Sequence, residues 1–153
     1  MSDLYDTMLI PADNRLSTGL TEQQLQKQIF ETLVRLGGLA IRINAGAAPI
    51  QNFDKRGRKT GSKRLVSFAF WQVAGRVLRR SGVSDLLYIW RGRFYAFELK
   101  KPGKYKFGLP LAQAPTENQA AFLKAVLENG GEAYVVDDLA QVLTLFGLEY
   151  SAF

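Results

Sequence analysis

A predicted β-hairpin at residues 82–101 constrains the fold of this chain more than any other feature. The strings LLYIW and RFYAFELK are dominated by large apolar and aromatic residues and are separated by Arg91-Gly92. A two-residue turn containing glycine is the shortest common hairpin connection, because glycine readily adopts the positive φ angle that such turns need. Counting back from this turn brings Asp85 opposite Glu98 on the two strands.

Two carboxylates placed opposite each other on paired strands repel, because their Cβ atoms lie about 4.5–5.5 Å apart. A divalent cation would offset that repulsion, and Mg²⁺ or Mn²⁺ needs only one or two carboxylates besides water and phosphate oxygens. Lys100 follows Glu98 by two residues and is therefore expected on the same face. Two alternatives are ordinary charged strand ends exposed to solvent, and a longer loop or bulge that shifts the register by one residue and separates Asp85 from Glu98.

Composition limits the chemistry available to this chain. Its 153 residues, 47% of them apolar, fit a single globular domain. Without Cys or His, the chain has no disulfide framework, no structural zinc site and no Ser-His-Asp or Cys-His catalytic group. No apolar run reaches the roughly 20 residues needed to span a bilayer, and the first residues lack the order of a signal peptide. We therefore expect a soluble, cytoplasmic protein.

The remaining segments predict an α/β sandwich with a mixed central sheet flanked by helices. Residues 1–19 have no clear period and are expected to form an arm, either loosely ordered or strapped onto the domain. Thr21 with Gln24, and Thr116 with Gln119, have the spacing of helix-capping boxes. Residues 74–82 fit a continuation of the preceding strand, a turn or a short helix. Helices are expected from 21, 116 and 138, and further strands at 39–44, 64–73 and 132–137.

Positive charge indicates an acidic partner. The net charge is +6 and the isoelectric point about 9.7, and nucleic acid is the commonest partner of such a domain. Ten residues, 55–64, hold six cations, two glycines and no apolar side chain, which predicts a flexible cationic loop that is either a DNA contact or simply solvated. These cations are Lys55, Arg56, Arg58, Lys59, Lys63 and Arg64.

Four motifs resemble the virus-type replication-repair nuclease (VRR-NUC) family of the PD-(D/E)xK nuclease superfamily, in its small stand-alone phage form. They are RINAGA, GVSDLL, FELKKPG and TENQAAFLKAVLENGGEAYVVDDLAQV, in that order along the chain. The resemblance covers about residues 20–145 and implies a restriction-endonuclease-like fold over 20–153, with a basic insertion at about 49–80. Val-Ser-Asp stands where the superfamily has its eponymous Pro-Asp.

The resemblance also implies roles for individual residues. Asp85 and Glu98 would bind Mg²⁺, for which Mn²⁺ would substitute, with the Leu99 carbonyl as an additional ligand and Lys100 as the catalytic lysine. Gln119 matches the glutamine of the family motif, although a plain capping role explains it equally well. Glu22 would be the acidic residue of the first helix, a candidate metal ligand that assists through the metal or its water, since it shares a face with apolar residues. Glu31 is the weaker candidate. Further DNA contacts are expected from Arg42, Asn44, Ser84, Lys101 and Lys104, besides the six cations above.

These residues together predict a Mg²⁺-dependent DNA endonuclease. The resemblance implies branched substrates such as Holliday junctions, and cutting a junction on two strands calls for a C₂ homodimer. The strand at 64–73 and the tail SAF are candidate dimer surfaces, although each also fits a core position. One alternative is a nickase, flap or end-processing nuclease of phage replication or repair, working beside a helicase. Another is a DNA-binding protein that has lost catalysis, which the intact Asp, Glu and Lys set opposes.

Overall fold

The computed structural model describes residues 8, 10, 14–43, 47–67, 71–73, 82–103 and 115–148. These residues form a mixed α/β structure with three helices and two separate sheets. None of the described helices combines the length and the apolarity that crossing a membrane requires. In chain order the elements are α2 (Glu22–Leu36), β1 (Leu39–Arg42), β2 (Ala47–Phe53), β3 (Lys59–Ser67), β4 (Leu86–Trp90), β5 (Arg93–Leu99), α3 (Glu117–Glu128), β6 (Glu132–Val136) and α4 (Leu139–Leu145).

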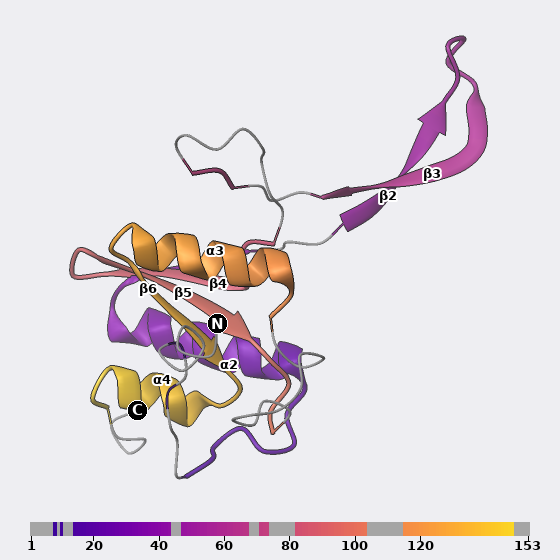
Figure 1. Cartoon of the computed structure of the whole chain (residues 1–153). Helices are drawn as coiled ribbons and strands as arrows, with labels where there is room; N and C mark the ends of the chain where they lie inside the picture. Colours follow the sequence, from indigo (N-terminus) through magenta and orange to yellow (C-terminus); the bar gives the residue numbers. More distant parts are fainter. Residues whose placement is uncertain are drawn as a thin grey trace.

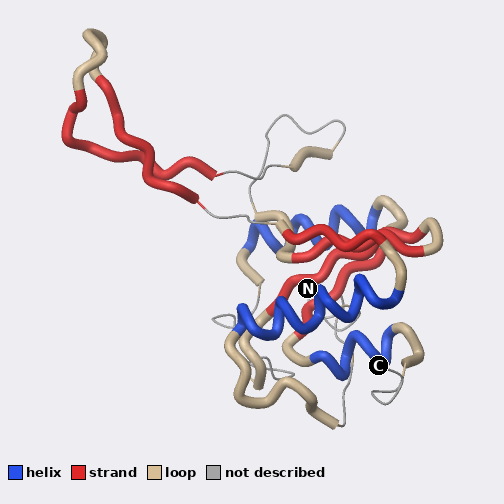
Figure 2. The backbone as a smooth tube through the Cα atoms, turned by 180° about the vertical axis from the view of Figure 1, so that it is seen from behind, coloured by secondary structure: helices blue, strands red, loops and turns tan. Residues whose placement is uncertain are grey.

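The main sheet has the strand order β1-β4-β5-β6. β4 pairs antiparallel with both β1 and β5, whereas β6 runs parallel to β5. Figures 1 and 2 show this sheet between two helical layers, with α3 on one face and α2 with α4 on the other. The predicted α/β sandwich with a mixed central sheet is therefore confirmed at this level.

Two apolar clusters fill the space between these layers, because alternate residues of each strand point to opposite faces. Tyr95, Phe97 and Leu99 of β5 pack into the cluster that also contains the buried residues of α2 and α4. Ala96 belongs to the cluster under α3, with Phe122. Buried side chains on both faces make β5 the central strand of the core.

Each of the three described helices begins at a capping box, which satisfies backbone N–H groups that have no partner within the helix. In α2 the Thr21 hydroxyl accepts from the Gln24 backbone N–H, and the Gln24 side chain accepts from the Thr21 N–H. Thr116 and Gln119 make the same pair of contacts at α3. Both predicted boxes are confirmed, and Asp138 begins α4 in the same way.

The hairpin β4–β5 has the predicted register. Trp90 pairs with Arg93, and the pairing continues without a shift to Leu86 opposite Phe97. Arg91 and Gly92 have φ angles of 49° and 74°, as expected for a two-residue turn with both central residues left-handed. The alternatives of a longer loop and of a bulge are wrong, so the position of Asp85 next to β5 follows from the turn.

The predicted flexible loop at residues 55–64 is wrong. Lys59–Ser67 is strand β3 and pairs antiparallel with β2, so the cationic residues belong to a β-hairpin. We call residues 47–67 the arm. Figure 1 shows the arm projecting away from the rest of the chain. Charge density alone suggested a loop, but a polar strand needs no buried face when it lies outside the core.

Asp54 builds the turn at the end of the arm. Its Oδ1 accepts from the backbone N–H groups of Arg56 and Arg58, and its Oδ2 accepts from Arg58 Nε at 3.0 Å. The Asp54 N–H also donates to the Arg58 carbonyl. These contacts, the Arg58 backbone donor first, lower the pKa of Asp54. A side chain that bonds its own backbone is a typical turn device, and it closes the hairpin with cations on either side.

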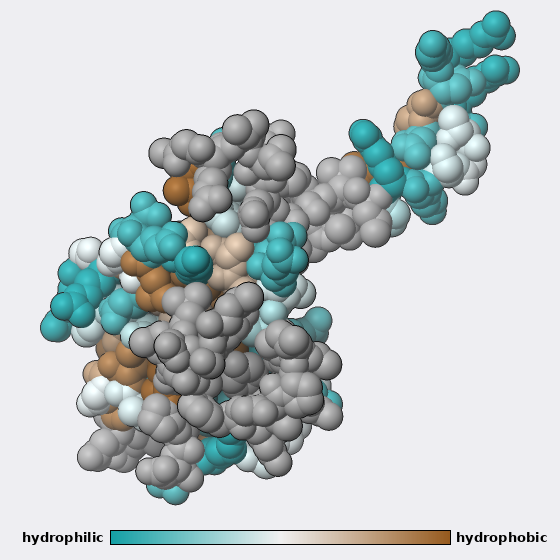
Figure 3. All heavy atoms as spheres, viewed as in Figure 1, coloured by the Kyte–Doolittle hydropathy of each residue, from teal (hydrophilic) through white to brown (hydrophobic). Residues whose placement is uncertain are grey.

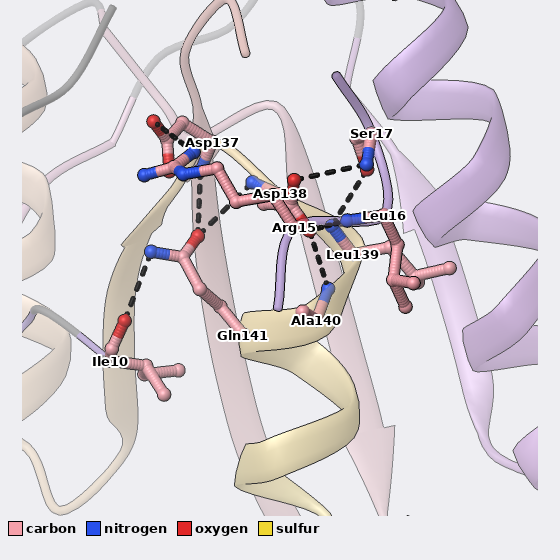
Figure 4. Close-up of polar contacts among 9 residues, drawn as sticks. All are labelled: Ile10, Arg15, Leu16, Ser17, Asp137, Asp138, Leu139, Ala140 and Gln141. Carbon is pink, nitrogen blue, oxygen red and sulfur yellow. Dashed lines mark hydrogen bonds and ion pairs between the residues drawn. The ribbon is translucent and has the colours of Figure 1, made fainter. Parts of the chain in front are cut away.

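Described residues of the N-terminal segment 1–19 are hydrogen-bonded to the start of α4. The buried carboxylate of Asp138 accepts from the backbone N–H groups of Leu16, Ser17 and Ala140, as Figure 4 shows. Asp137 pairs with Arg15 at 3.0 Å. Hydrogen bonds to the carboxylates of Asp137 and Asp138 therefore hold the residues around Ser17 against the domain.

Several predicted features differ from the structure or lie outside the described residues. β1 ends at Arg42, so the strand expected over 39–44 is shorter. Of the strand expected at 64–73, residues 64–67 belong to β3, and residues 68–70 lie outside the described residues. Asn44, Lys104, the tail SAF and nearly all of the undecided segment 74–82 lie outside the described residues.

Candidate active site

Asp85 and Glu98 lie at the same end of the main sheet, where β4 begins and β5 ends. Asp85 directly precedes β4, and its backbone carbonyl accepts from the Ile43 N–H at 2.8 Å, which continues the β1–β4 pairing. Its carboxylate Oδ2 accepts from the backbone N–H of Leu99 at 2.8 Å. The carboxylate of Asp85 therefore rests against the strand that carries Glu98.

Glu98 is a buried carboxylate with one unsatisfied oxygen. Its residue is 1% exposed, and Oε2 has no hydrogen-bond partner among the described residues. Its other oxygen, Oε1, accepts from Lys100 Nζ at 3.1 Å. A buried polar atom without a partner costs free energy, so this oxygen is where an additional ligand or a proton would be most stabilising.

Burial raises the pKa values of both carboxylates, and the charge of Asp85 raises that of Glu98 further. The pKa of Glu98 rises to about 8, because the group is desolvated and lies near the charge of Asp85, although Lys100 opposes the shift. Burial also raises the pKa of Asp85, against the Leu99 hydrogen bond. Without a bound cation, a proton on Glu98 therefore relieves the repulsion that the sequence predicted.

Lys100 places a cation beside this pair. Its side chain is 20% exposed, in contrast to the 1% of Glu98, so the ammonium group sits between the buried carboxylate and solvent. The backbone N–H of Lys100 donates to the Val136 carbonyl of β6 at 2.9 Å. That bond extends the β5–β6 pairing by one residue and fixes Lys100 on the same face as Glu98, as predicted.

The structure brings Glu22 and Arg42 into the electrostatic environment of the carboxylates. The charge of Glu22 raises the pKa of both Asp85 and Glu98, and Arg42 lowers that of Asp85. Glu22 is exposed at the first turn of α2. Glu31, the weaker candidate, is exposed and forms a surface ion pair with Lys27 at 3.9 Å.

Metal ligands in this cluster would come from two carboxylates. Among the described residues, no group of three Asp, Glu, His or Cys side chains is arranged to hold a metal ion. Glu22 is therefore near the pair without completing a three-carboxylate set. Two carboxylates suffice for Mg²⁺, which keeps several water or phosphate ligands.

Ser84 and Gln119 have positions that bear on their predicted roles. Ser84 is fully buried and its hydroxyl has no partner among the described residues, which does not fit a direct contact with DNA. The Gln119 side-chain oxygen accepts from the Thr116 N–H, so it serves the capping box of α3.

The predicted DNA-binding cations fall into two groups. Lys101 is exposed immediately beyond Lys100, and Arg42 is exposed at the end of the edge strand β1. The six cations of residues 55–64 are all exposed, on the arm.

Gly82 is a supporting residue that we did not single out from the sequence. Its φ is +91°, and a Cβ added there would lie 2.8 Å from the Asn118 Cβ and 3.1 Å from the Gln119 backbone nitrogen. The chain leading to Asp85 therefore passes directly against the first turn of α3. The only sequence signal was a glycine three residues before the aspartate.

Gly82→Ala should destabilise the protein more than a glycine substitution that meets only a backbone penalty. Gly130→Ala is the matched control, because its φ is +83° but nothing lies within 4 Å of its added Cβ. We expect a loss of about 1 kcal/mol for Gly130→Ala and about 2–4 kcal/mol for Gly82→Ala, measured by urea unfolding. Equal losses would show that the contact with α3 is unimportant.

Comparison with known proteins gives no relative. No family model matches the chain, no curated protein shows significant similarity, and no solved structure gives a significant match. Functional inference therefore depends on the residues of the site and on the motifs of the sequence.

Proposed function

We propose that this protein is a Mg²⁺-dependent DNA endonuclease that hydrolyses phosphodiester bonds at the Asp85, Glu98 and Lys100 cluster. The observation that carries the proposal is the buried, unsatisfied Oε2 of Glu98 beside a second carboxylate and a lysine. Buried side-chain oxygens normally have hydrogen-bond partners. Glu132 and Asp137 each have another such oxygen without a hydrogen-bond partner among the described residues, but Glu98 combines it with a second carboxylate nearby and a strongly raised pKa. A buried carboxylate with a strongly raised pKa and a specific charge partner is a candidate for a functional site.

The donor set fits a hard divalent cation. Asp85 and Glu98 supply carboxylate oxygens from adjacent strands, and the Leu99 carbonyl is a further proposed ligand. Mg²⁺, for which Mn²⁺ would substitute, would polarise the scissile phosphate and lower the pKa of a coordinated water molecule. Glu98 must lose its proton to take part, so its raised pKa favours activity above neutral pH.

Lys100 is proposed to act on the nucleophile and on the phosphate. Its ammonium group is partly exposed and already oriented by Glu98, so it can donate hydrogen bonds toward a substrate without rearrangement. In that position it would orient the attacking water and stabilise the charge that develops in the transition state. Arg42 would contact the phosphate backbone at the edge of the same site, and Glu22 would assist from α2.

The arrangement of elements supports the finer fold proposal. A helix, three antiparallel strands, a second helix and a parallel strand follow in the order expected for a restriction-endonuclease-like domain of the VRR-NUC type, with the arm inserted between β1 and β4. The catalytic carboxylates of that family type are proposed at Asp85 and Glu98, by resemblance. The proposed location is the bacterial or phage-infected host cytoplasm.

Branched DNA is the proposed substrate, and a C₂ homodimer the proposed assembly. Two sites related by a two-fold axis would cut the two strands of a four-way junction symmetrically. A nickase, flap or end-processing activity beside a helicase is the second candidate, supported by the same catalytic residues.

A substrate panel separates these activities. Labelled four-way junction, flap, single-stranded and linear duplex DNA are incubated with the protein in Mg²⁺, Mn²⁺ or EDTA. We expect paired symmetric incisions in the junction with either metal and none in EDTA. Single nicks or flap removal without junction cleavage would favour the second candidate, and activity in EDTA would reject a metal-dependent mechanism.

Gln119→Glu distinguishes a capping role from a catalytic one. Glutamate at this position preserves the capping box and is favourable near a helix N-terminus, so stability should remain within about 0.5 kcal/mol. Gln119→Ala should lose about 0.5–1 kcal/mol. Because the side chain is occupied by Thr116, we expect Gln119→Glu to cleave within threefold of the wild-type rate. A loss of a hundredfold or more, with Gln24→Glu unaffected, would assign Gln119 to catalysis.

A further inference from the structure

The arm carries most of the net positive charge of this chain. Residues 47–67 contain six cations and one carboxylate, that of Asp54, so they contribute +5 of the net charge of +6. The rest of the chain has 14 cations and 13 carboxylates and is therefore nearly neutral. The only acidic side chain of the arm is already bound to Arg58 and to the turn backbone. An acidic partner would consequently be attracted to the arm.

Cations lie on both faces of the arm and at its turn. Lys63 pairs with Gln51 and its neighbour Arg64 pairs with Ile50. Since successive residues of a strand point to opposite faces, Lys63 and Arg64 point in opposite directions. Figure 3 shows hydrophilic residues along most of the projecting arm. A flat acidic surface would contact the cations on only one face of the arm. A groove bordered by phosphates on both sides would contact the cations on both faces.

The dimensions and twist of the arm suit a duplex groove. Its strands have 7 and 9 residues, which gives a ribbon roughly 23 Å long. The pairing shifts between Gln51 and Phe53, opposite Gly61 with a φ of +80°, and such bulges increase the right-handed twist of a ribbon. The major groove of B-form DNA, about 12 Å wide, admits a two-stranded ribbon.

A second copy of the chain is the alternative binding partner of the arm. Ile50 and Phe53 are 40% and 58% exposed and could contact another protomer. However, the remainder of a second copy is nearly neutral and its own arm is cationic, so it offers no complement to six positive charges.

We propose that the arm is a DNA-gripping β-ribbon that lies in the major groove of duplex DNA and supplies most of the affinity for the substrate. This inference deepens the proposed function, because it names the element that holds the DNA. It rests on that function only in taking DNA as the substrate.

Two triple variants of the 153-residue chain test the arm. Lys59→Gln/Lys63→Gln/Arg64→Gln changes the arm, and Lys27→Gln/Arg35→Gln/Lys124→Gln changes exposed cations of α2 and α3. Both lower the net charge from +6 to +3. Binding to a labelled 20-base-pair DNA duplex is followed by fluorescence anisotropy in EDTA over a series of salt concentrations.

The arm variant should bind about 10–100-fold more weakly at 100 mM salt. The slope of log K against log salt concentration should become smaller in magnitude by about 2–3, since each lost phosphate contact accounts for about 0.9. The control variant should keep its slope within one unit of the wild type. Equal losses in both variants would overturn the inference, since net charge alone would then explain binding. Unchanged binding by the arm variant would overturn it too.

Two further measurements complete the test. One is binding to an RNA duplex of the same length, and the other is sedimentation velocity of the protein variants. The deep, narrow major groove of RNA excludes a ribbon, so the two variants should differ less than threefold on RNA. An equally large loss on RNA would overturn the groove assignment. A change from dimer to monomer in the arm variant, with an unchanged DNA salt slope, would assign the arm to a second copy. Arm-dependent binding by a protein that cleaves no DNA would support the arm and reject the nuclease proposal.

Discussion

Replacing Glu98 by Gln should abolish metal-dependent DNA cleavage, by at least about 10³-fold, while stabilising the metal-free protein at alkaline pH. The native pKa of Glu98 is about 8, against an ordinary value of 4.5. Between these two values the native state binds more protons than the unfolded state, so the free energy of unfolding falls as pH rises. Glutamine does not titrate and its oxygen can still accept from Lys100, so Glu98→Gln avoids that loss.

The gain should be measured by urea unfolding in EDTA. We expect Glu98→Gln to exceed the wild type by about 1–3 kcal/mol at pH 9 and by much less at pH 5. Mg²⁺ at pH 9 should raise the melting temperature of the wild type but not that of Glu98→Gln, because the variant lacks a ligand. Glu132→Gln is a suitable control, since this carboxylate lies at the opposite end of β6. Equal pH dependence of the wild type and Glu98→Gln would contradict the raised pKa.

Replacing Lys100 by Met should reduce the rate of cleavage by about 10²–10⁴-fold while leaving metal binding in place. Methionine keeps much of the unbranched apolar stem but removes the ammonium group that lies 3.1 Å from Glu98. Loss of that cation should raise the pKa of Glu98 further, because Lys100 is one of the groups that lower it. The residual activity should therefore require a more alkaline pH than that of the wild type.

Melting temperatures at pH 9 with and without Mg²⁺ separate the role of Lys100 from that of the carboxylates. We expect the stabilisation by Mg²⁺ to persist in Lys100→Met, in contrast to Glu98→Gln. Lys101→Met is the matched control, because its side chain is the neighbouring exposed lysine and only DNA affinity should change. Cleavage by Lys100→Met at the wild-type rate would remove Lys100 from the mechanism.

The local rules that predicted this site are the ones that tertiary structure seldom overrides. Arg91-Gly92 specified the turn, and the turn specified the register that places Asp85 beside β5. Capping pairs such as Thr21 with Gln24 likewise fixed the helix starts. These features depend on neighbours in sequence, so one sequence is enough to predict them.

The sequence does not predict the arm, because a run of charges without an apolar pattern is typical of a solvated loop. Residues 55–64 have no alternating apolar pattern, since neither face of β3 at Lys63 and Arg64 is buried. β3 is held by its partner strand and by the turn at Asp54. A strand held in this way needs no alternation of apolar and polar residues in its sequence. The degree of burial of Glu98 and its unsatisfied oxygen also had no signature, because burial depends on how α2 and α3 pack around the sheet.

One measurement tests the central claim most directly: cleavage of a labelled four-way junction in Mg²⁺ by the wild type and by Asp85→Asn, side by side. Asparagine retains an oxygen that can accept from the Leu99 N–H at this position, so the fold should be preserved, as circular dichroism would show. We predict that the wild type cleaves the junction, and that Asp85→Asn binds it with unchanged affinity in EDTA but cleaves it at least 10³-fold more slowly. Cleavage by Asp85→Asn at the wild-type rate would contradict the assignment of the active site.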